Sequence, residues 1–237
     1  MSPETSSPET FADRRLRVWV TRAQPAAEAT AARLRALGFE PVVAPVLEIR
    51  PLADATLDLV GVDALAFTSA AGVSAFAGLT TTRDLKVFAV GEATAGAARA
   101  AGFRDVRSAQ GDVHALADLI ASAAPHPSLV LNPTAADPAA DLAELLADRG
   151  VATRSTVVYE TRETALGAPP ADLDAMLIHS AKAAHAATRW LSGADVSALA
   201  VYAISAAAAS PLVSLGSRHV GVAAFPTEAA LLSLLGG

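Results

Sequence analysis

The chain contains two copies of one α/β pattern, and this duplication constrains its fold more than any other feature. The segment VWVTRAQPAAEATAARLRALGFEPVVAPVLEIR is matched later by LVLNPTAADPAADLAELLADRGVATRSTVVYETR. Two further stretches also have counterparts, so that Gly38, Ser69 and Gly102 correspond to Gly150, Ser180 and Gly216. Two α/β halves of this kind are expected to leave a cleft between them, and clefts are where proteins bind ligands.

Composition limits the class of protein. The chain has 237 residues, of which 52% are hydrophobic and 18% are charged, so it is expected to fold into one or two domains. The net charge is −6, and no basic run is interleaved with aromatic residues, which argues against a nucleic-acid partner. The absence of cysteine excludes disulfides, iron–sulfur clusters and thiolate zinc ligands.

Two segments bear on where the protein resides. Residues 1–14 are polar and lack the apolar stretch of a signal peptide, so they are predicted to be a disordered tail. Residues 198–215 have few polar side chains, but Pro211 interrupts them and they repeat a βα unit of the first half. A buried strand with its helix explains them better than a membrane span. We therefore expect a soluble, cytoplasmic protein with no membrane partner.

Short apolar runs alternate with longer helical ones along the whole chain. Strands are expected at 17–20, 42–49, 63–67, 86–90, 128–131, 152–159, 174–178, 199–204 and 220–223, and helices at 26–37, 70–78, 92–101, 112–123, 137–148, 181–191, 206–215 and 227–235. Alternating βα units predict parallel sheets with helices on both faces. Right-handed crossovers then bring the strand-to-helix turns to one edge of each sheet, where ligands bind.

Two long extended segments, 41–54 and 153–170, lie outside this βα rhythm at equivalent places in the two halves. Side by side they would form a two-strand connection between lobes.

The strand-to-helix turns are chemically alike, since each places small hydroxyl or glycine residues before a helix. They are Thr21-Arg22, Thr68-Ser69, Gly91 to Thr94, Asn132-Pro133-Thr134, His179-Ser180 and Ser205. Free backbone N–H groups and the positive end of the helix dipole make such turns suitable for carboxylates or phosphates. The alternative is that each Ser or Thr is only a helix N-cap.

Common catalytic signatures are missing. The segment GEATAG has the glycine spacing of a P-loop but not its Lys-Ser/Thr ending, and none of the five histidines has metal-ligand spacing. Ser180, Lys182 and His185 lie close in sequence, which a surface helix also explains. Tyr159 ends an extended segment, where its phenol could donate a proton or could simply pack at an interface.

Several short motifs, taken in order, resemble uroporphyrinogen-III synthase. They are V-x-V-T-R near the start, TSAAGVSAF at 68–76, VGEATA at 90–95, VVYET at 157–161 and the closing F-P-T-x-x-A-L-L, within 216–232. The resemblance covers nearly the whole chain from Arg15 onward.

The resemblance implies an activity and an architecture. The family converts hydroxymethylbilane to uroporphyrinogen III in tetrapyrrole biosynthesis, losing water and inverting ring D through a spiro intermediate, without cofactor or metal. It also implies two Rossmann-like or flavodoxin-like lobes with parallel sheets, joined by a two-stranded antiparallel connection. Lobe 1 would comprise 15–41 and 166–237, lobe 2 would be 53–150, and 42–52 and 151–165 would be linker strands.

The resemblance also implies site residues. Tyr159 would assist departure of the hydroxyl, and Thr21, Arg22, Ser69, Gly91 and Thr94 match the family's substrate-binding turns. Three further residues are expected to bind substrate on other grounds: Ser180 and Ser205 would compensate in part where the second half departs from the family pattern, and Lys182 would help to offset the negative net charge. The implied partner is hydroxymethylbilane, handed over by hydroxymethylbilane synthase to a monomeric lyase.

The second half departs from the family pattern. It has His179-Ser180 where Thr-Ser is usual, and Ile204 to Ala208 where a G-x-T-T turn is usual. These departures motivate an alternative, a weakly active or non-catalytic two-lobe protein that binds a tetrapyrrole or another polyanion as a sensor. A sugar-phosphate or nucleotide enzyme on a similar fold finds no supporting motif.

Overall fold

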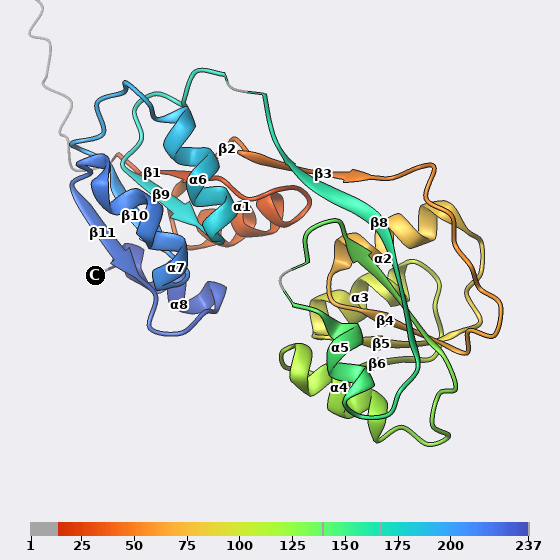
Figure 1. Cartoon of the computed structure of the whole chain (residues 1–237). Coiled ribbons are helices and arrows are strands. Elements are labelled where there is room, and N and C mark those ends of the chain that lie inside the picture. Colours follow the sequence, from red (N-terminus) through yellow and green to blue (C-terminus); the bar gives the residue numbers. More distant parts are fainter. Residues whose placement is uncertain (1–13, 139, 166, 237) are drawn as a thin grey trace, which may run out of the picture. The chain divides into compact units, whose positions relative to one another are not determined.

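The computed structural model describes residues 14–138, 140–165 and 167–236, so the predicted tail lies outside the described residues except for Arg14. The chain divides into two compact units (Figure 1). Unit 1 joins the segment that ends at Glu48 to the segment that begins at Glu163, and unit 2 is Ile49–Arg162. Each unit is built around one sheet with helices on both of its faces, which confirms the predicted α/β class.

The sheet of unit 1 has the strand order β11-β10-β9-β1-β2, and all four neighbouring pairs are parallel. Its elements are β1 (Arg17–Val20), α1 (Ala26–Ala36), β2 (Glu40–Val43), β9 (Ala175–Ile178), α6 (Ala181–Trp190), β10 (Ala200–Ala203), α7 (Ala206–Ala209), the 3₁₀ helix η2 (Ser210–Leu215), β11 (His219–Val222), α8 (Glu228–Ser233) and the 3₁₀ helix η3 (Leu234–Gly236).

The sheet of unit 2 has the order β3-β8-β7-β4-β5-β6. Its elements are β3 (Leu47–Pro51), β4 (Ala64–Phe67), α2 (Ala70–Leu79), β5 (Lys86–Ala89), α3 (Glu92–Ala100), β6 (Val106–Ser108), α4 (Val113–Ala121), β7 (Val130–Ala135), α5 (Leu142–Ala147) and β8 (Thr153–Glu163). The strands from β8 to β6 pair in parallel.

The two sheets have the same spatial order once the sequence duplication is taken into account. Strands β4, β5 and β6 of unit 2 correspond to β9, β10 and β11 of unit 1, and β7 and β8 correspond to β1 and β2. Each sheet therefore combines strands from both copies of the repeat. The direction of winding reverses between β1 and β9 in unit 1 and between β7 and β4 in unit 2, and such switch points are where open α/β sheets bind ligands.

Alternating side chains of the central strands fill a core on each face of each sheet. In unit 2, Leu65 and Phe67 face one helix layer with Phe76, while Ala64 and Ala66 face the other with Leu116. Unit 1 repeats this division. Trp19 and Met176 pack beneath α6, and the neighbouring residues of β1 and β9 pack beneath α1 and α8. Burial on both faces explains why these strands form continuous apolar runs in the sequence.

Strands β3 and β8 form the predicted antiparallel pair. The Leu52 N–H donates to the Val158 carbonyl at 2.9 Å, and the Thr164 N–H donates to the Val46 carbonyl at 3.1 Å. Residue numbers thus rise along β3 while they fall along its partner β8, which defines an antiparallel pair.

Two prolines explain two of the places where the predicted elements were wrong; β6 was not predicted, and the helix expected at 137–148 begins only at Leu142. The single extended segment expected at 42–49 is two strands, because residues 44–46, with Pro45 at their centre, interrupt it. The helix expected at 206–215 ends at Ala209 and continues as η2, because Pro211 has no N–H for an α-helical bond to the residue four before it.

A further correction concerns Asn132-Pro133-Thr134, which was expected to be a turn and lies inside β7. A proline inside a parallel sheet is unusual because it cannot donate to the ladder. Here β7 pairs with β4 only at Val130 and Leu131, and Pro133 lies beyond that point, paired with β8 alone. The strand tolerates the proline because the side of β7 that faces β4 is no longer paired at this position.

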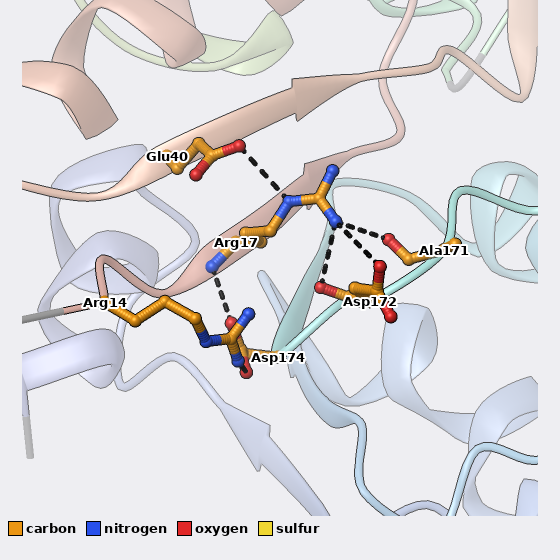
Figure 2. Close-up of polar contacts among 6 residues, drawn as sticks. All are labelled: Arg14, Arg17, Glu40, Ala171, Asp172 and Asp174. Atoms are coloured by element: carbon orange, nitrogen blue, oxygen red, sulfur yellow. Dashed lines mark hydrogen bonds and ion pairs between the residues drawn. The ribbon is translucent and has the colours of Figure 1, made fainter. Parts of the chain in front are cut away.

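A polar cluster fixes the amino-terminal edge of the unit 1 sheet, as Figure 2 shows. The Arg17 guanidinium donates to the Ala171 carbonyl at 2.8 Å and to Glu40 at 3.2 Å. Asp174 accepts the Arg17 backbone N–H at 2.7 Å and also pairs with Arg14. These contacts tie β1 to β2 and to the segment that leads into β9.

Replacing Arg17 by Gln is expected to lower the free energy of unfolding of unit 1 by about 1 kcal/mol, because the hydrogen bonds of the guanidinium to the Ala171 and Asp172 carbonyls and its exposed ion pair with Glu40 are lost. Urea unfolding followed by tryptophan fluorescence measures this, since both tryptophans, Trp19 and Trp190, belong to unit 1. Arg15→Gln, at an exposed neighbouring position, is the matched control. Equal midpoints for the two variants would show that the cluster does not stabilise the sheet.

Candidate active site

The switch point of unit 2 opens into a cavity of about 440 Å³. Its walls come from the carboxyl ends of β4, β5 and β7, the start of α4, the segment before α5 and the middle of β8. The lining residues are Thr68, Ser69, Val90, Val113, Thr134, Ala135, Asp137, Pro138, Ala140, Tyr159 and Thr161. Hydroxyl groups thus converge on one cavity from three strands.

Ser69 and Tyr159 meet in this cavity although 90 residues separate them. The Ser69 Oγ lies 2.8 Å from the Tyr159 hydroxyl and accepts the Gly72 N–H at 3.1 Å. The Tyr159 ring packs among apolar residues of the same unit, including Ala75 and Val158, and only 8% of the residue is exposed. Packing fixes the ring and leaves the phenol oxygen at the polar wall.

The pair can supply a proton from a defined atom. Ser69 caps α2, so its oxygen already accepts a hydrogen bond while its own O–H remains available as a donor. If that O–H points to Tyr159, the phenol proton is free to be donated to a group in the cavity. The hydrogen bond from Gly72 polarises Ser69 and strengthens this chain of donors. The geometry therefore combines the two roles considered for these residues, capping and proton donation.

Gly91 and Thr94 flank this wall but do not line the cavity. Gly91 caps α3 with an extended backbone that any residue adopts, and a Cβ placed there would meet nothing within 4 Å. Thr94 is buried, 5% exposed, within the first turn of α3. Their assignment as substrate-binding residues stays a prediction, and at Gly91 the protein fold itself does not require glycine.

The switch point of unit 1 brings together the turns after β1 and β9. Thr21 is fully buried there, and its hydroxyl donates to the Leu177 carbonyl at 2.6 Å. Its side chain therefore joins the two strands, and its assignment as a substrate-binding residue stays a prediction. Arg22 follows it with 30% of its side chain exposed. The Arg22 guanidinium lies 3.4 Å from the Thr30 hydroxyl and 3.7 Å from a carboxylate oxygen of Glu228.

Burial lowers the pKa of the Arg22 guanidinium; the negative charge of Glu228 opposes this shift, and the nearby Arg33 adds to it. Arg22 is thus a desolvated cation at the ligand edge of the sheet. A ligand carboxylate that paired with this partly desolvated guanidinium would gain more binding free energy than one that paired with an exposed arginine.

The three other predicted residues of this unit lie at the starts of helices. Ser180 caps α6 by accepting the Ala183 N–H at 3.1 Å, and Ser205 caps α7 by accepting the Ala208 N–H at 3.3 Å. Lys182 is exposed on the first turn of α6. The capping serines are engaged as acceptors, and their O–H protons still allow them to donate to an anion. A role for all three in binding stays a prediction.

His179 was not singled out from the sequence and is the most unusual polar group of this unit. Neither ring nitrogen has a hydrogen-bond partner among the described residues, although both are buried. Burial, reinforced by the charge of Arg22, lowers the pKa of His179 to about 3. The imidazole is therefore neutral and has one donor and one acceptor unused beside Arg22. The only sequence signal was its departure from the expected Thr-Ser pair.

Glu228 was also missed, because nothing in the sequence distinguishes a glutamate at the start of a predicted helix from one on a solvated surface. Thr161 and Asp137 line the cavity of unit 2 and were not proposed as site residues either, although Thr161 belongs to the VVYET motif. In residues 14–138, 140–165 and 167–236, no cluster of three His, Asp or Glu side chains has the arrangement of a metal site. None of the helices described is both long and apolar enough to cross a bilayer.

The fold and these sites define a class, a duplicated α/β protein whose switch points bring hydroxyls, helix starts and a part-buried cation to the edges of the sheets where α/β proteins bind ligands. The family model described as uroporphyrinogen-III synthase HemD matches residues 28–233. The chain belongs to the uroporphyrinogen-III synthase family. It is accordingly a cyclising lyase of porphyrin biosynthesis, in a family that acts on hydroxymethylbilane.

A solved structure agrees with the fold. The chain is similar to uroporphyrinogen-III synthetase from Helicobacter pylori 26695, with a TM-score of 0.66 and 19% identity over 94% of this chain and 98% of that one. It also matches a mutant uroporphyrinogen III synthase from Thermus thermophilus, with a TM-score of 0.48 and 19% identity over 93% and 96% of the two chains. A search among curated proteins found no significant match.

The buried imidazole of His179 should make unit 1 sensitive to acid. Because its pKa is about 3 in the folded chain and near 6.5 when exposed, only the unfolded state binds a proton between these values. Folding should therefore weaken as pH falls below 6.5, by up to about 1.4 kcal/mol per pH unit from this group. The penalty should stop growing near pH 3, where the folded form also takes up the proton.

Urea unfolding at pH 7, 6, 5 and 4, followed by tryptophan fluorescence, measures this effect in unit 1. His179→Gln should show a shallower loss of stability across the series than the wild type, and His185→Gln, at an exposed position of the same unit, controls for loss of a histidine. Parallel slopes for wild type and His179→Gln would contradict the proposed cost of protonation.

Proposed function

We propose that this chain converts hydroxymethylbilane to uroporphyrinogen III, and the observation that carries the proposal is the family match over residues 28–233. The Ser69–Tyr159 pair, with its oxygens 2.8 Å apart in a cavity at a sheet switch point, supports it as a place where a hydroxyl could be protonated. The reaction removes one water and closes a ring.

The chemistry balances without an electron carrier. The carbon–oxygen bond to the terminal hydroxyl of the bilane breaks, and the oxygen leaves as water with a proton from an acid. The resulting carbon electrophile is attacked at ring D to give the spiro intermediate, which fragments and recloses with that ring inverted. When the ring closes, the attacking carbon of the ring D pyrrole loses its hydrogen as a proton. This proton balances the one given to the departing hydroxyl, so that the loss of water is the only net change. We propose that no cofactor takes part.

In this proposal the chain's residues divide between holding and protonating the substrate. Arg22 and the helix starts capped by Ser180 and Ser205 bind ring carboxylates in unit 1, because they combine a desolvated cation with helix N-termini. Tyr159 donates to the departing hydroxyl, with Ser69 fixing its orientation. Most of the rate enhancement comes from folding the bilane into its reactive shape.

The setting of the reaction belongs to the same proposal. The enzyme acts as a cytoplasmic monomer, and hydroxymethylbilane synthase hands over the substrate. Residues 15–41 with 166–237 and residues 53–150 serve as its two lobes, with 42–52 and 151–165 as the linkers.

Isomer analysis tests the proposed reaction directly. Hydroxymethylbilane made enzymatically is supplied to the protein, the products are oxidised, and the type I and type III porphyrins are separated. Predominantly type III product is expected, since spontaneous closure gives type I. A mixture no richer in type III than the protein-free control would reject the proposed function.

Tyr159→Phe is expected to lower kcat by about 10- to 100-fold while the product remains type III, because it removes one proton donor and leaves the binding surface intact. Ser69→Ala should show a smaller loss of kcat together with a loss of about 1 kcal/mol from the α2 cap. Val157→Ala, at an exposed position of the same strand, is the control. Wild-type turnover by Tyr159→Phe would remove the phenol from the mechanism.

A further inference from the structure

Three side chains converge on the carboxylate of Glu228, the first residue of α8. One oxygen, Oε1, accepts a hydrogen bond from the Thr30 hydroxyl. The other, Oε2, accepts from the Arg33 guanidinium and lies 3.7 Å from Nη1 of Arg22. The carboxylate is therefore shared between two arginines and joins the turn after β1, helix α1 and the start of α8.

The cluster is part-buried, and its three charged side chains are exposed to different degrees. The side chain of Glu228 is 20% exposed, that of Arg22 30% and that of Arg33 56%. Charges in such a place interact more strongly than on the open surface, because less water screens them. The position of Glu228 in the first turn of a helix, just after the cap Thr227, further favours its negative charge.

Glu228 acts on Arg22 through charge more than through contact. A separation of 3.7 Å is too long for a hydrogen bond, and the hydrogen bond from Arg22 to Thr30 is itself long, at 3.4 Å. Within the part of the chain that the structure describes, these are the two partners found for a guanidinium that has five N–H donors. Most of the N–H donors of Arg22 thus remain available to a carboxylate of a ligand.

We infer that Glu228 is a built-in counter-carboxylate that limits how tightly the Arg22 site holds the carboxylates of its ligand. The inference rests on the proposed function and adds to it a residue that sets affinity. Glu228 is a positioning residue in this scheme, since it acts through Arg22 and Arg33 and does not touch the reacting atoms.

The chemistry of the reaction explains why a limit on affinity is useful. Uroporphyrinogen III differs from hydroxymethylbilane by the loss of one water, so the product keeps every carboxylate of the substrate. A site that binds these groups too tightly would retain the product as firmly as it captures the substrate. A fixed negative charge beside the cations weakens both interactions and favours release.

Replacing Glu228 by Gln tests the inference because Gln keeps an acceptor for Thr30 and removes the charge. KM for hydroxymethylbilane is expected to fall about three- to tenfold, with kcat equal to or below that of the wild type, and inhibition by uroporphyrinogen III should strengthen to a similar degree. The change in KM should shrink as salt is raised, because it is electrostatic. Glu228→Asp should restore KM and product inhibition toward the wild-type values.

The matched control is Glu40→Gln, which removes a glutamate paired with Arg17 at 3.2 Å on the amino-terminal edge of the same unit. It should leave KM unchanged. If Glu228 only held α8 to α1, its Gln variant would lose stability while KM stayed equal or rose and kept the wild-type salt dependence, and that result would overturn the inference. Loss of type III product from the wild type itself would instead reject the proposed function on which the inference depends.

Discussion

The pairing of β1 with β9, and of β4 with β7, is the constraint on which the rest of the molecule depends. In each case a strand from one copy of the repeat pairs in parallel with a strand from the other copy. Both members must be apolar on both faces, because helices cover the sheet on each side. The residues that follow the paired strands are then brought together by the pairing alone, whatever the sequence of the segments that connect the strands.

Each of these pairs also defines a ligand edge. Thr21, the residue after β1, closes the end of the first pair by donating to the Leu177 carbonyl of β9, and part-buried Arg22 follows it at the sheet edge. In the second pair, the early separation of β7 from β4 leaves space for the cavity that contains Ser69 and Tyr159. The candidate site residues thus lie where the hydrogen bonding between the two strands ends, and packing of the core determines where the strands pair.

The sequence predicted the elements of this arrangement well where local pattern decides them. The strand at 17–20 was predicted with the bounds that the structure has, since a short apolar run before a turn and an amphipathic helix has few other interpretations. Local pattern failed at Pro133, which looked like a turn residue; whether a proline can stay in a strand depends on whether the neighbouring strand has already ended. That information belongs to the partner strand and not to the segment itself.

The same distinction separates the site residues. Ser69 and Tyr159 were each proposed from the sequence, but their contact depends on the register of β8 against β7, which is bulged between Thr134 and Ala135. Glu228 could not be distinguished from a surface glutamate, because its role depends on two arginines about 200 residues earlier in the chain. Long-range neighbours, more than residue type, decide which charges act together.

The two switch points have become chemically different although they descend from one repeat. In unit 2 the cavity is lined by the hydroxyls of Ser69 and Tyr159 as well as by Asp137, and a hydroxyl acts only at hydrogen-bond distance, which suits the delivery of a proton to one atom. In unit 1 the switch point presents Arg22 beside a neutral His179 and a counter-charge, an arrangement whose field extends over several ångströms and suits the capture of mobile carboxylates. The short reach of one site and the longer reach of the other match the two demands of the proposed reaction. A flexible polyanion has to be gathered first, and a single hydroxyl then has to be protonated.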